Sequence, residues 1–380
     1  MKILVVSNKD SKCVSLIPKD VNKLVSSRIQ VYVTSNTTKL CDYSNNDYIN
    51  AGAKIIDKLT PEFIKTIDIV SFVDFPKDKK IIKLLSDKQI LWGFMYLVNN
   101  SKNLFLALKK GLTTVAIETI NSKNVHEYLL PIEQIKGENI LTLVEKQIKE
   151  YKNSQDYIKK MKKHVHARVS ENNVLILNYS YSGYYVAKAA LASGCNVTYL
   201  ENDATLAHEL KTTKELQTLA NLHKCHFDVT EASYDNLCDK VKDANIFIVT
   251  SQFPTVKTSL RITKDMISSM PLGSAYVNLA SETGFASITE IKPTTINKPS
   301  IVYNGVNHIN IENIYDMFPK QASEIISNLN TKNFLEINKP SIYDSRFKNA
   351  IMTYNHCLTN KEIASSLHLK YTNIDSIKKI

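Results

Sequence analysis

The stretch Val174-Leu-Ile-Leu-Asn-Tyr-Ser-Tyr-Ser-Gly-Tyr-Tyr-Val-Ala-Lys-Ala-Ala-Leu-Ala-Ser-Gly194 decides the fold. An apolar run leads into a short polar turn, and a segment of small residues follows the turn. This order predicts a strand, a tight turn and a helix, which is how a dinucleotide-binding βαβ unit begins. Such a turn normally carries G-x-G-x-x-G, whereas this chain has Asn178-Tyr-Ser-Tyr-Ser-Gly183. The strand–turn–helix unit is therefore predicted, and the residues of the turn decide whether it binds a ligand.

Short apolar runs alternate with amphipathic segments on both sides of this stretch, which predicts parallel sheets built from βαβ units. We expect strands at 3–6, 29–33, 69–73, 89–94 and 113–117, and again at 174–177, 197–200, 246–249, 275–279 and 301–303. Helices are expected at 18–25, 101–110 and 263–270, and near 313–329. A long helix at about 138–163 is expected to bridge two domains.

The length and composition are typical of a two-domain globular protein. The chain has 380 residues, of which 43% are hydrophobic and 22% charged. No apolar run reaches the roughly 20 residues of a membrane helix, and the start lacks a signal-peptide cleavage site. We therefore expect a cytoplasmic protein without direct membrane insertion.

The net charge of +11 does not point to nucleic acid, because only four of the 48 basic residues are arginine, the residue that base readout favours. The six cysteines are scattered and predict reduced thiols. His223-Lys-Cys-His226 has no second ligand pair at a suitable spacing, so no metal site is expected. Nine glycines in the whole chain argue against an elaborate phosphate cradle.

Several motifs, in their order, resemble the alanine dehydrogenase/transhydrogenase family. They are Cys13-Val-Ser-Leu-Ile-Pro-Lys-Asp-Val-Asn-Lys-Leu-Val25, Tyr48-Ile-Asn-Ala-Gly-Ala-Lys-Ile-Ile56, Ile90-Leu-Trp-Gly-Phe-Met-Tyr-Leu-Val-Asn-Asn100, Ala244-Asn-Ile-Phe-Ile-Val-Thr-Ser-Gln-Phe-Pro254 and Leu260-Arg-Ile-Thr-Lys-Asp-Met-Ile-Ser-Ser-Met-Pro-Leu-Gly-Ser-Ala-Tyr-Val-Asn-Leu-Ala280. The tail, with Asn307-His-Ile-Asn and Gln321-Ala-Ser-Glu-Ile-Ile-Ser-Asn-Leu329, is more similar to the alpha subunit of proton-translocating NAD(P) transhydrogenase.

The resemblance implies an α/β fold with two Rossmann-like domains and parallel sheets. The first would span 1–135 and be completed by about 307–380, with the C-terminal helix packing back on it. The second, 136–306, would bind NAD(H). The resemblance also implies a homodimer and a membrane-embedded beta-type partner subunit, through which the protein would lie peripherally at the inner membrane.

On the dinucleotide pattern, Asn178, Ser180 and Gly183 take the places of the three glycines. Asn tolerates left-handed backbone angles, so the first exchange is mild. Ser180 adds a Cβ and a hydroxyl where the pyrophosphate would approach, and either clashes with it or donates a hydrogen bond. Gly183 meets the need for close helix–strand packing. Glu201, at the end of the second strand, either bonds a ribose hydroxyl or is an exposed strand-end acid.

Ser180, Gly183 and Glu201 are thus the candidate NAD(H)-binding residues. Tyr179 and Tyr181 are bulky where small residues are expected. They either fill the space of the nucleotide or provide a platform on which it stacks.

The catalytic positions of the family are altered. In the loop that places the nicotinamide, Ser122, Glu127 and Leu130 stand where Arg, Gln and Asp are expected. Cys13, Asp74 and Tyr96 replace the Arg, Lys and His that alanine oxidation needs, and Glu282 is the only acid near the place of the family's catalytic acid. We assign no catalytic residue.

Hydride transfer between two nucleotides needs no general acid or base, so it tolerates these exchanges. The leading hypothesis is a divergent transhydrogenase alpha-type subunit that binds NAD(H) and passes hydride to NADP on a partner subunit. The alternatives are a non-catalytic interaction protein that kept the fold, and an amino-acid dehydrogenase with an altered substrate.

Overall fold

The computed structural model describes residues 1–6, 11–35, 37, 41–75, 79–87, 89–97, 101–122, 125–161, 173–250, 260, 262–280, 294–311, 313–337, 342 and 346–377. The chain divides into two compact units. The first comprises residues 1–132 and 315–380, and the second comprises residues 133–314.

The sheet of the first unit has the strand order β17-β16-β6-β5-β4-β1-β2-β3 within the described ranges. The strands are β1 Lys2–Val5, β2 Gln30–Thr34, β3 Lys54–Ile56, β4 Ile69–Asp74, β5 Ile90–Phe94, β6 Thr113–Ala116, β16 Ile351–Tyr354 and β17 Cys357–Leu358. Strands β1 to β6 are parallel and follow the order 3-2-1-4-5-6 of a doubly wound Rossmann sheet. β16 is antiparallel to β6. β7 Asn121–Ser122 and β8 Val125–His126 form a separate ribbon.

Seven helices of the described chain belong to the first unit. They are α1 Pro18–Ser26, α2 Asn45–Asn50, α3 Pro61–Ile64, α4 Lys79–Leu84, α5 Ser101–Lys110, α13 Pro319–Glu336 and α14 Lys361–Ser366. α5 has the expected bounds and ends at Gly111, whose φ of +70° permits the chain to leave the helix.

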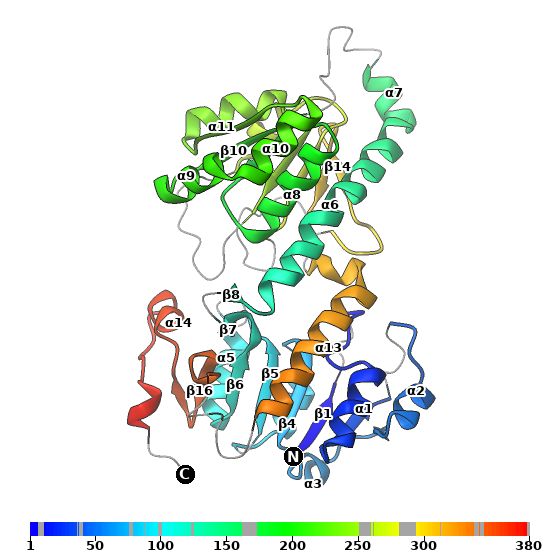
Figure 1. Cartoon of the computed structure of the whole chain (residues 1–380), viewed down its shortest axis with the longest axis vertical. Coiled ribbons are helices and arrows are strands. Elements are labelled where there is room, and N and C mark those ends of the chain that lie inside the picture. The colour runs from blue at the N-terminus through cyan, green and yellow to red at the C-terminus, as the bar shows by residue number, and fades with distance from the viewer. Residues whose placement is uncertain are drawn as a thin grey trace. The chain divides into compact units, whose positions relative to one another are not determined.

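The C-terminal helix α13 packs back on the first unit, as predicted, and lies beside α1 (Figure 1). Two serines of α13 receive backbone N–H groups from the segment before α1. Ser323 Oγ accepts from Val14 at 2.9 Å, and Ser327 Oγ accepts from Ile17 at 2.9 Å. The helix begins later than expected, at Pro319, because proline suits a first helical position, where no N–H is needed.

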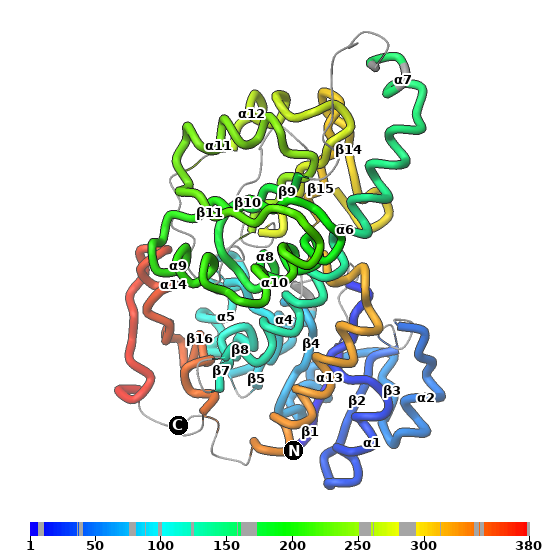
Figure 2. The backbone as a smooth tube through the Cα atoms, turned by 45° about the horizontal axis from the view of Figure 1, so that its top comes forward, coloured from blue at the N-terminus to red at the C-terminus, as the bar shows by residue number. Residues whose placement is uncertain are grey.

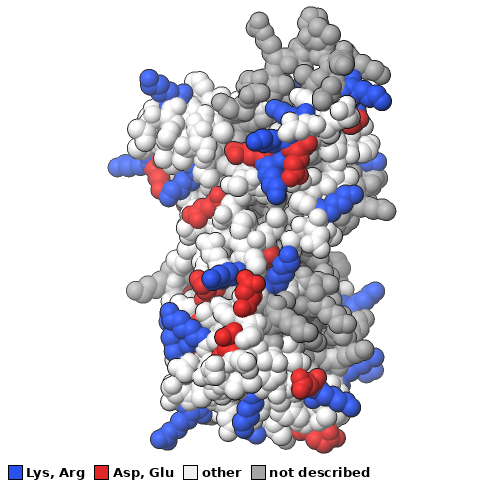
Figure 3. Space-filling view, turned by 90° about the vertical axis from the view of Figure 1, so that its right-hand side faces the viewer, with Lys and Arg blue, Asp and Glu red and all other residues white. Residues whose placement is uncertain are grey.

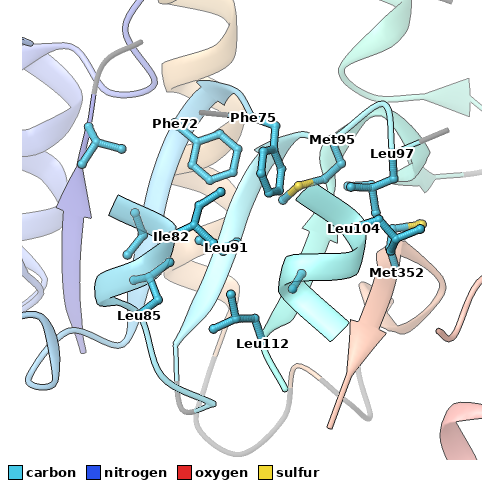
Figure 4. Close-up of a cluster of buried hydrophobic side chains, with 14 of the residues drawn as sticks. Phe72, Phe75, Ile82, Leu85, Leu91, Met95, Leu97, Leu104, Leu112 and Met352 are labelled. Carbon is cyan, nitrogen blue, oxygen red and sulfur yellow. The ribbon is translucent and has the colours of Figure 1, made fainter. Parts of the chain in front are cut away.

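One hydrophobic cluster fills the space between the sheet and the helices on one face (Figure 4). The rings of Phe72 on β4 and Phe75 meet edge to face at 5.8 Å. Leu91 from β5, Leu104 from α5 and Met352 from β16 close the same cluster. Burial of these side chains fixes the first sheet and therefore the loops at its carboxyl edge.

The second unit repeats the Rossmann order. Its sheet reads β11-β10-β9-β12-β13-β15-β14 over the residues described, with all neighbours parallel except β14 and β15. The strands are β9 Asn173–Leu177, β10 Asn196–Glu201, β11 Phe227–Glu231, β12 Ile246–Val249, β13 Ala275–Asn278, β14 Ile301–Tyr303 and β15 Val306–Ile309. The two-domain α/β fold is therefore confirmed.

The helices of the second unit cover this sheet. They are α7 Gln155–Met161, α8 Tyr181–Ala192, α9 Ala204–Thr212, α10 Lys214–His223, α11 Tyr234–Lys240 and α12 Lys264–Ser268, together with most of α6 Leu129–Lys152. α8 and α10 pack side by side (Figure 2). α6 packs against α8 at Gly137, where an added Cβ would lie 2.5 Å from the Ser182 carbonyl oxygen. α12 is capped by Thr263, whose Oγ1 accepts from the Met266 N–H at 3.3 Å.

Other details also differ from the sequence expectation. The long helix begins earlier, at Leu129, and is divided at Asn153 and Ser154 into α6 and α7. β11 was not expected, because it is an edge strand with exposed polar residues. β15 was not expected, because its residues Asn307 and His308 are polar. This strand pairs with β13, so the second unit extends past Val306.

Among the residues that the structure describes, no helix combines the length and apolar character needed to cross a bilayer. On the face shown in Figure 3, lysine and arginine side chains are dispersed and interspersed with aspartate and glutamate.

Candidate functional site

The turn between β9 and α8 keeps the backbone shape of a dinucleotide turn without its first two glycines. Asn178 has a φ of +67°, which is the left-handed conformation that the first glycine normally supplies. Thr250, after β12, holds the turn, since its Oγ1 donates to the Asn178 carbonyl at 2.5 Å. The Asn178 side chain donates in return to the Thr250 carbonyl at 3.2 Å. Sequence reasoning missed Thr250, because nothing in its local pattern distinguishes it.

Ser180 caps α8. Its Oγ accepts the Gly183 N–H at 3.0 Å and lies 3.0 Å from Ser182 Oγ. The first N–H groups of a helix lack intrahelical acceptors and otherwise point to water or an anion. Ser180 thus satisfies one of these donors within the chain. The Tyr181 and Ser182 N–H groups have no intrahelical acceptor, by the geometry of a first turn.

Gly183 is required by packing. A Cβ at this position would collide with the Tyr199 hydroxyl and lie 3.1 Å from Thr250 Oγ1. Tyr199, on β10, is fully buried, and its hydroxyl has no hydrogen-bond partner among the described residues. Gly183 therefore allows α8 to approach β9 and β10, a need that exists with or without a ligand.

Glu201 lies directly beside the turn. Its Oε2 accepts the Tyr179 N–H at 2.6 Å, and its Oε1 accepts the Asn202 and Asp203 N–H groups at 2.8 and 2.9 Å. The side chain is fixed by these bonds and the residue is only 8% exposed. A carboxylate has about four acceptor positions, so capacity remains for a further donor. The structure brings Ser180, Gly183 and Glu201 together at one end of the sheet.

Tyr179 and Tyr181 are both half-buried. Burial raises the pKa of Tyr179, and Glu209 of α9 with Tyr181 and Tyr185 adds to the rise. The Tyr179 phenol therefore stays protonated at neutral pH.

In the first unit, the segment that matches the family's nicotinamide loop has a different role. Ser122 is exposed on β7, and Leu130 is part of α6. Glu127 forms an ion pair with Arg346 at 2.6 Å. This pair joins the segment to the C-terminal region and explains why an acid occupies the position.

The structure places Cys13, Asp74 and Tyr96 at the carboxyl edge of the first sheet. Asp74 accepts a hydrogen bond from the Tyr315 hydroxyl, and both residues are buried. The neighbouring Asp316 accepts from Ser11 Oγ at 2.7 Å. Burial and then the Asp316 carboxylate raise the pKa of Cys13. These acidic groups would repel a carboxylate substrate. Glu282 lies outside the described residues.

Glu118 was not singled out in the sequence, although it organises this edge. Its carboxylate accepts the Met95 and Tyr96 N–H groups at 2.9–3.1 Å. Tyr96 has a φ of +39°, so the acid stabilises an unusual backbone conformation. Burial raises the pKa of Glu118 to about 7.

Two family models match the chain. The N-terminal domain of the alanine dehydrogenase/PNT family matches residues 7–132, and its C-terminal domain matches residues 150–365. The chain belongs to the alanine dehydrogenase/PNT family. It is 26% identical over 367 residues to alanine dehydrogenase 1 of Staphylococcus aureus, covering 95% of each chain.

Two solved structures share the fold. An L-alanine dehydrogenase has a TM-score of 0.73 at 18% identity and covers 97% of this chain and 99% of its own. A transhydrogenase from Sinorhizobium meliloti has a TM-score of 0.68 at 16% identity, and the match covers 95% of this chain and 100% of the transhydrogenase chain. Both branches of the family therefore resemble this chain in fold.

Proposed function

We propose that this family member binds NAD(H) at the turn between β9 and α8 and acts as a divergent alpha-type subunit of NAD(P) transhydrogenase. One observation carries the proposal. The left-handed Asn178, the start of α8 and the Glu201 carboxylate are assembled at one end of the second sheet. Relatives named alanine dehydrogenase and transhydrogenase add support.

The described residues fit a dinucleotide in part. The Tyr181 and Ser182 N–H groups and the α8 dipole favour a pyrophosphate. Glu201 suits a ribose hydroxyl and disfavours the 2′-phosphate of NADP, because like charges repel. Bound NAD(H) would supply the hydride chemistry, while the chain holds and orients it.

The first unit favours hydride exchange over amino-acid oxidation. An amino-acid carboxylate needs cationic partners. Asp74 instead pairs with Tyr315, and Asp316 lies next to Tyr315 in the chain. Hydride transfer to NADP on a partner subunit makes no such demand. An amino-acid dehydrogenase with altered substrate is therefore the weakest of the three functions.

The proposed partners are a second copy of this chain and a membrane-embedded beta-type subunit, which would hold the protein peripherally at the inner membrane in the cytoplasm. Two observations support these partners. The tail resembles transhydrogenase alpha subunits, and hydride transfer between two nucleotides needs no general acid or base from this chain.

A second candidate function is a non-catalytic interaction protein. The observation that favours it is the internal satisfaction of the turn. Ser180 accepts the Gly183 N–H, and Glu201 accepts the Tyr179 N–H. Two donors of the turn are thus satisfied within the chain, which leaves fewer for a pyrophosphate.

The two functions are separated by hydride transfer. The purified chain is mixed with the isolated NADP-binding domain of a bacterial transhydrogenase, and reduction of an NAD analogue by NADPH is followed by absorbance. The proposal predicts turnover that Glu201→Gln lowers and Glu231→Gln does not. Glu231 is the matched control, since it is an exposed acid that pairs with Glu201 in the register of β11 and β10. Absence of turnover, together with absence of NADH binding, supports the interaction protein.

A further inference from the structure

Two half-buried cysteines of the second unit, Cys195 and Cys225, occupy equivalent positions in the fold. Cys195 comes directly before β10, and Cys225 comes shortly before β11. Each follows a residue with left-handed backbone angles that ends a helix. Gly194 has a φ of +79° after α8, and Lys224 has a φ of +56° after α10. The chain therefore leaves both helices in the same way.

The hydrogen bonds at the two helix ends are also the same. The Cys195 N–H donates to the Ala190 carbonyl at 2.9 Å, and the Cys225 N–H donates to the Ala220 carbonyl at 3.0 Å. This is the closing bond of a Schellman motif, in which the chain turns back over the last helical carbonyls. Both cysteines are thus held at the same point of the same backbone turn.

The two cysteines also lie next to each other across β10 and β11. These strands are parallel, and Val197 is paired with Phe227. The chains are already in contact just before this pair, because His226 accepts the Val197 N–H at 2.8 Å and donates its own N–H to Asn196 Oδ1 at 2.9 Å. Two residues before the pair, the same register places the two cysteines opposite each other. Paired residues of neighbouring strands have Cα atoms about 4.8 Å apart, and a disulfide spans about 4.4–6.8 Å.

Both thiols are on the face of the sheet that α8 covers. Side chains alternate between the two faces of a strand, so Cys195 shares a face with Tyr199. The Tyr199 hydroxyl lies under α8, where an added Cβ at Gly183 would meet it. The Cys225 thiol lies 3.8 Å from the carbonyl oxygen of Leu191 in the same helix. The two side chains therefore point to the same side of the sheet.

Small molecules can reach this pair. Both cysteines are half-buried, and Cys195 also lines a cavity of about 460 Å³. No three His, Cys, Asp or Glu side chains are grouped to hold a metal in the part of the chain that the structure describes. The pair therefore offers two neighbouring thiols to a small oxidant.

We propose that Cys195 and Cys225 form a redox-sensitive pair, which hydroperoxides oxidise to a disulfide between the starts of β10 and β11. The pair depends only on the register of these strands, so it does not rest on nucleotide binding at the turn between β9 and α8. In a reducing compartment such a bond is transient and acts as a redox sensor.

The reaction has two steps. The thiolate of one cysteine attacks a peroxide oxygen and the O–O bond breaks, which gives a sulfenic acid and, from hydrogen peroxide, hydroxide. The second thiol then attacks the sulfenic sulfur, the S–S bond forms and the S–O bond breaks, with release of water. The two thiols lose two electrons and two protons in total, and the peroxide is reduced to two water molecules.

The disulfide would restrain the edge of the second sheet. β11 stands at the end of the described strand order, next to β10. A covalent link at its start restricts local opening of this strand. Amide hydrogen exchange of Phe227–Glu231 should therefore slow after oxidation and recover when dithiothreitol reduces the bond. Unchanged exchange in the cross-linked chain would overturn this consequence.

The test is oxidation of the full chain by hydrogen peroxide. Burial raises the pKa of both thiols, so the reaction is run at about pH 8.5, where more thiolate is present. The chain is then denatured and alkylated with N-ethylmaleimide without reductant, and its peptides are analysed by mass spectrometry. We expect Cys195 and Cys225 to lose alkylation together and to appear in one cross-linked peptide pair that dithiothreitol separates. Cys238, a half-buried cysteine of α11, is the internal reference and should stay alkylated.

Variants test the register. Cys225→Ser should abolish the cross-link, and the matched control Cys238→Ser should keep it. Cys225→Ser together with His226→Cys moves the thiol by one residue and therefore to the other face of the sheet, so this double variant should not form the cross-link. The proposal is overturned if both thiols of the wild type stay alkylated, if peroxide oxidises them without a cross-link within one chain, or if the double variant cross-links equally well.

Discussion

Replacing Ser180 with glycine should strengthen NADH binding. The Ser180 Oγ accepts the Gly183 N–H at 3.0 Å, so this donor is not available to a pyrophosphate. Glycine removes both the competing oxygen and the Cβ. A hydrogen bond to a charged group contributes about 1.5–3 kcal/mol, and every 1.4 kcal/mol corresponds to about a tenfold change in affinity. We expect the NADH dissociation constant to fall by roughly tenfold.

The stability change should be small, because a serine cap replaced by glycine costs only about a few tenths of a kcal/mol. Ser180→Ala is the matched comparison, since it removes the oxygen and keeps the Cβ. It should lower the free energy of unfolding by about 1 kcal/mol and improve NADH binding less than glycine does. Binding is followed by quenching of protein fluorescence, and unfolding by urea. If Ser180→Gly binds NADH no more tightly than the wild type, the capped turn is not what limits affinity, and the reasoning is refuted.

Three further predictions concern stability. Gly183→Ala should lower the free energy of unfolding by about 1–3 kcal/mol, because the added Cβ would collide with the Tyr199 hydroxyl. In urea unfolding, Tyr199→Phe should relieve part of this loss. If the effects of the two substitutions on the free energy of unfolding are additive, the packing role of Gly183 is contradicted. Burial raises the pKa of Glu118 from 4.5 to about 7, so the folded chain holds more protons than the unfolded chain between these values, and stability should fall by about 3 kcal/mol as the pH rises through them. Glu118→Gln should remove this fall, as measured by amide hydrogen exchange of β5 and β6, and an unchanged pH profile would count against it. Burial lowers the pKa of His308 from 6.5 to about 4, so the second unit should instead lose about 3 kcal/mol as the pH falls between these values. His308→Gln should abolish that loss in hydrogen exchange of β13 and β15, and persistence of the loss would exclude His308 as its cause.

Local patterns predicted most of the fold. The strands at Ile246–Val249 and Ile301–Tyr303 have their expected bounds, because continuous apolar or β-branched runs are bordered by turn residues. β15 was missed because Asn307 and His308 are buried by tertiary contacts and not by a local apolar pattern. Such burial depends on neighbouring strands far away in the sequence.

The sequence predicted the strand, turn and helix that form the candidate site, but not the hydrogen bonds within it. The left-handed conformation at Asn178 follows from residue chemistry, and the structure has it. The sequence left open whether Ser180 clashes or donates, whereas its Oγ accepts the Gly183 N–H. Neither the hydrogen bond from Thr250 to the turn nor the packing of Tyr199 against Gly183 was expected, since both residues reach the turn from neighbouring strands. Pairings of this kind are set by the sheet order, which single residues do not reveal.

Titration calorimetry of the wild-type chain with NADH, with NADPH as the comparison, measures whether the turn between β9 and α8 binds the nucleotide. The account predicts a dissociation constant for NADH in the micromolar range and much weaker binding of NADPH, because the Glu201 carboxylate would repel the 2′-phosphate. No heat and no shift in melting temperature at millimolar NADH would contradict the account.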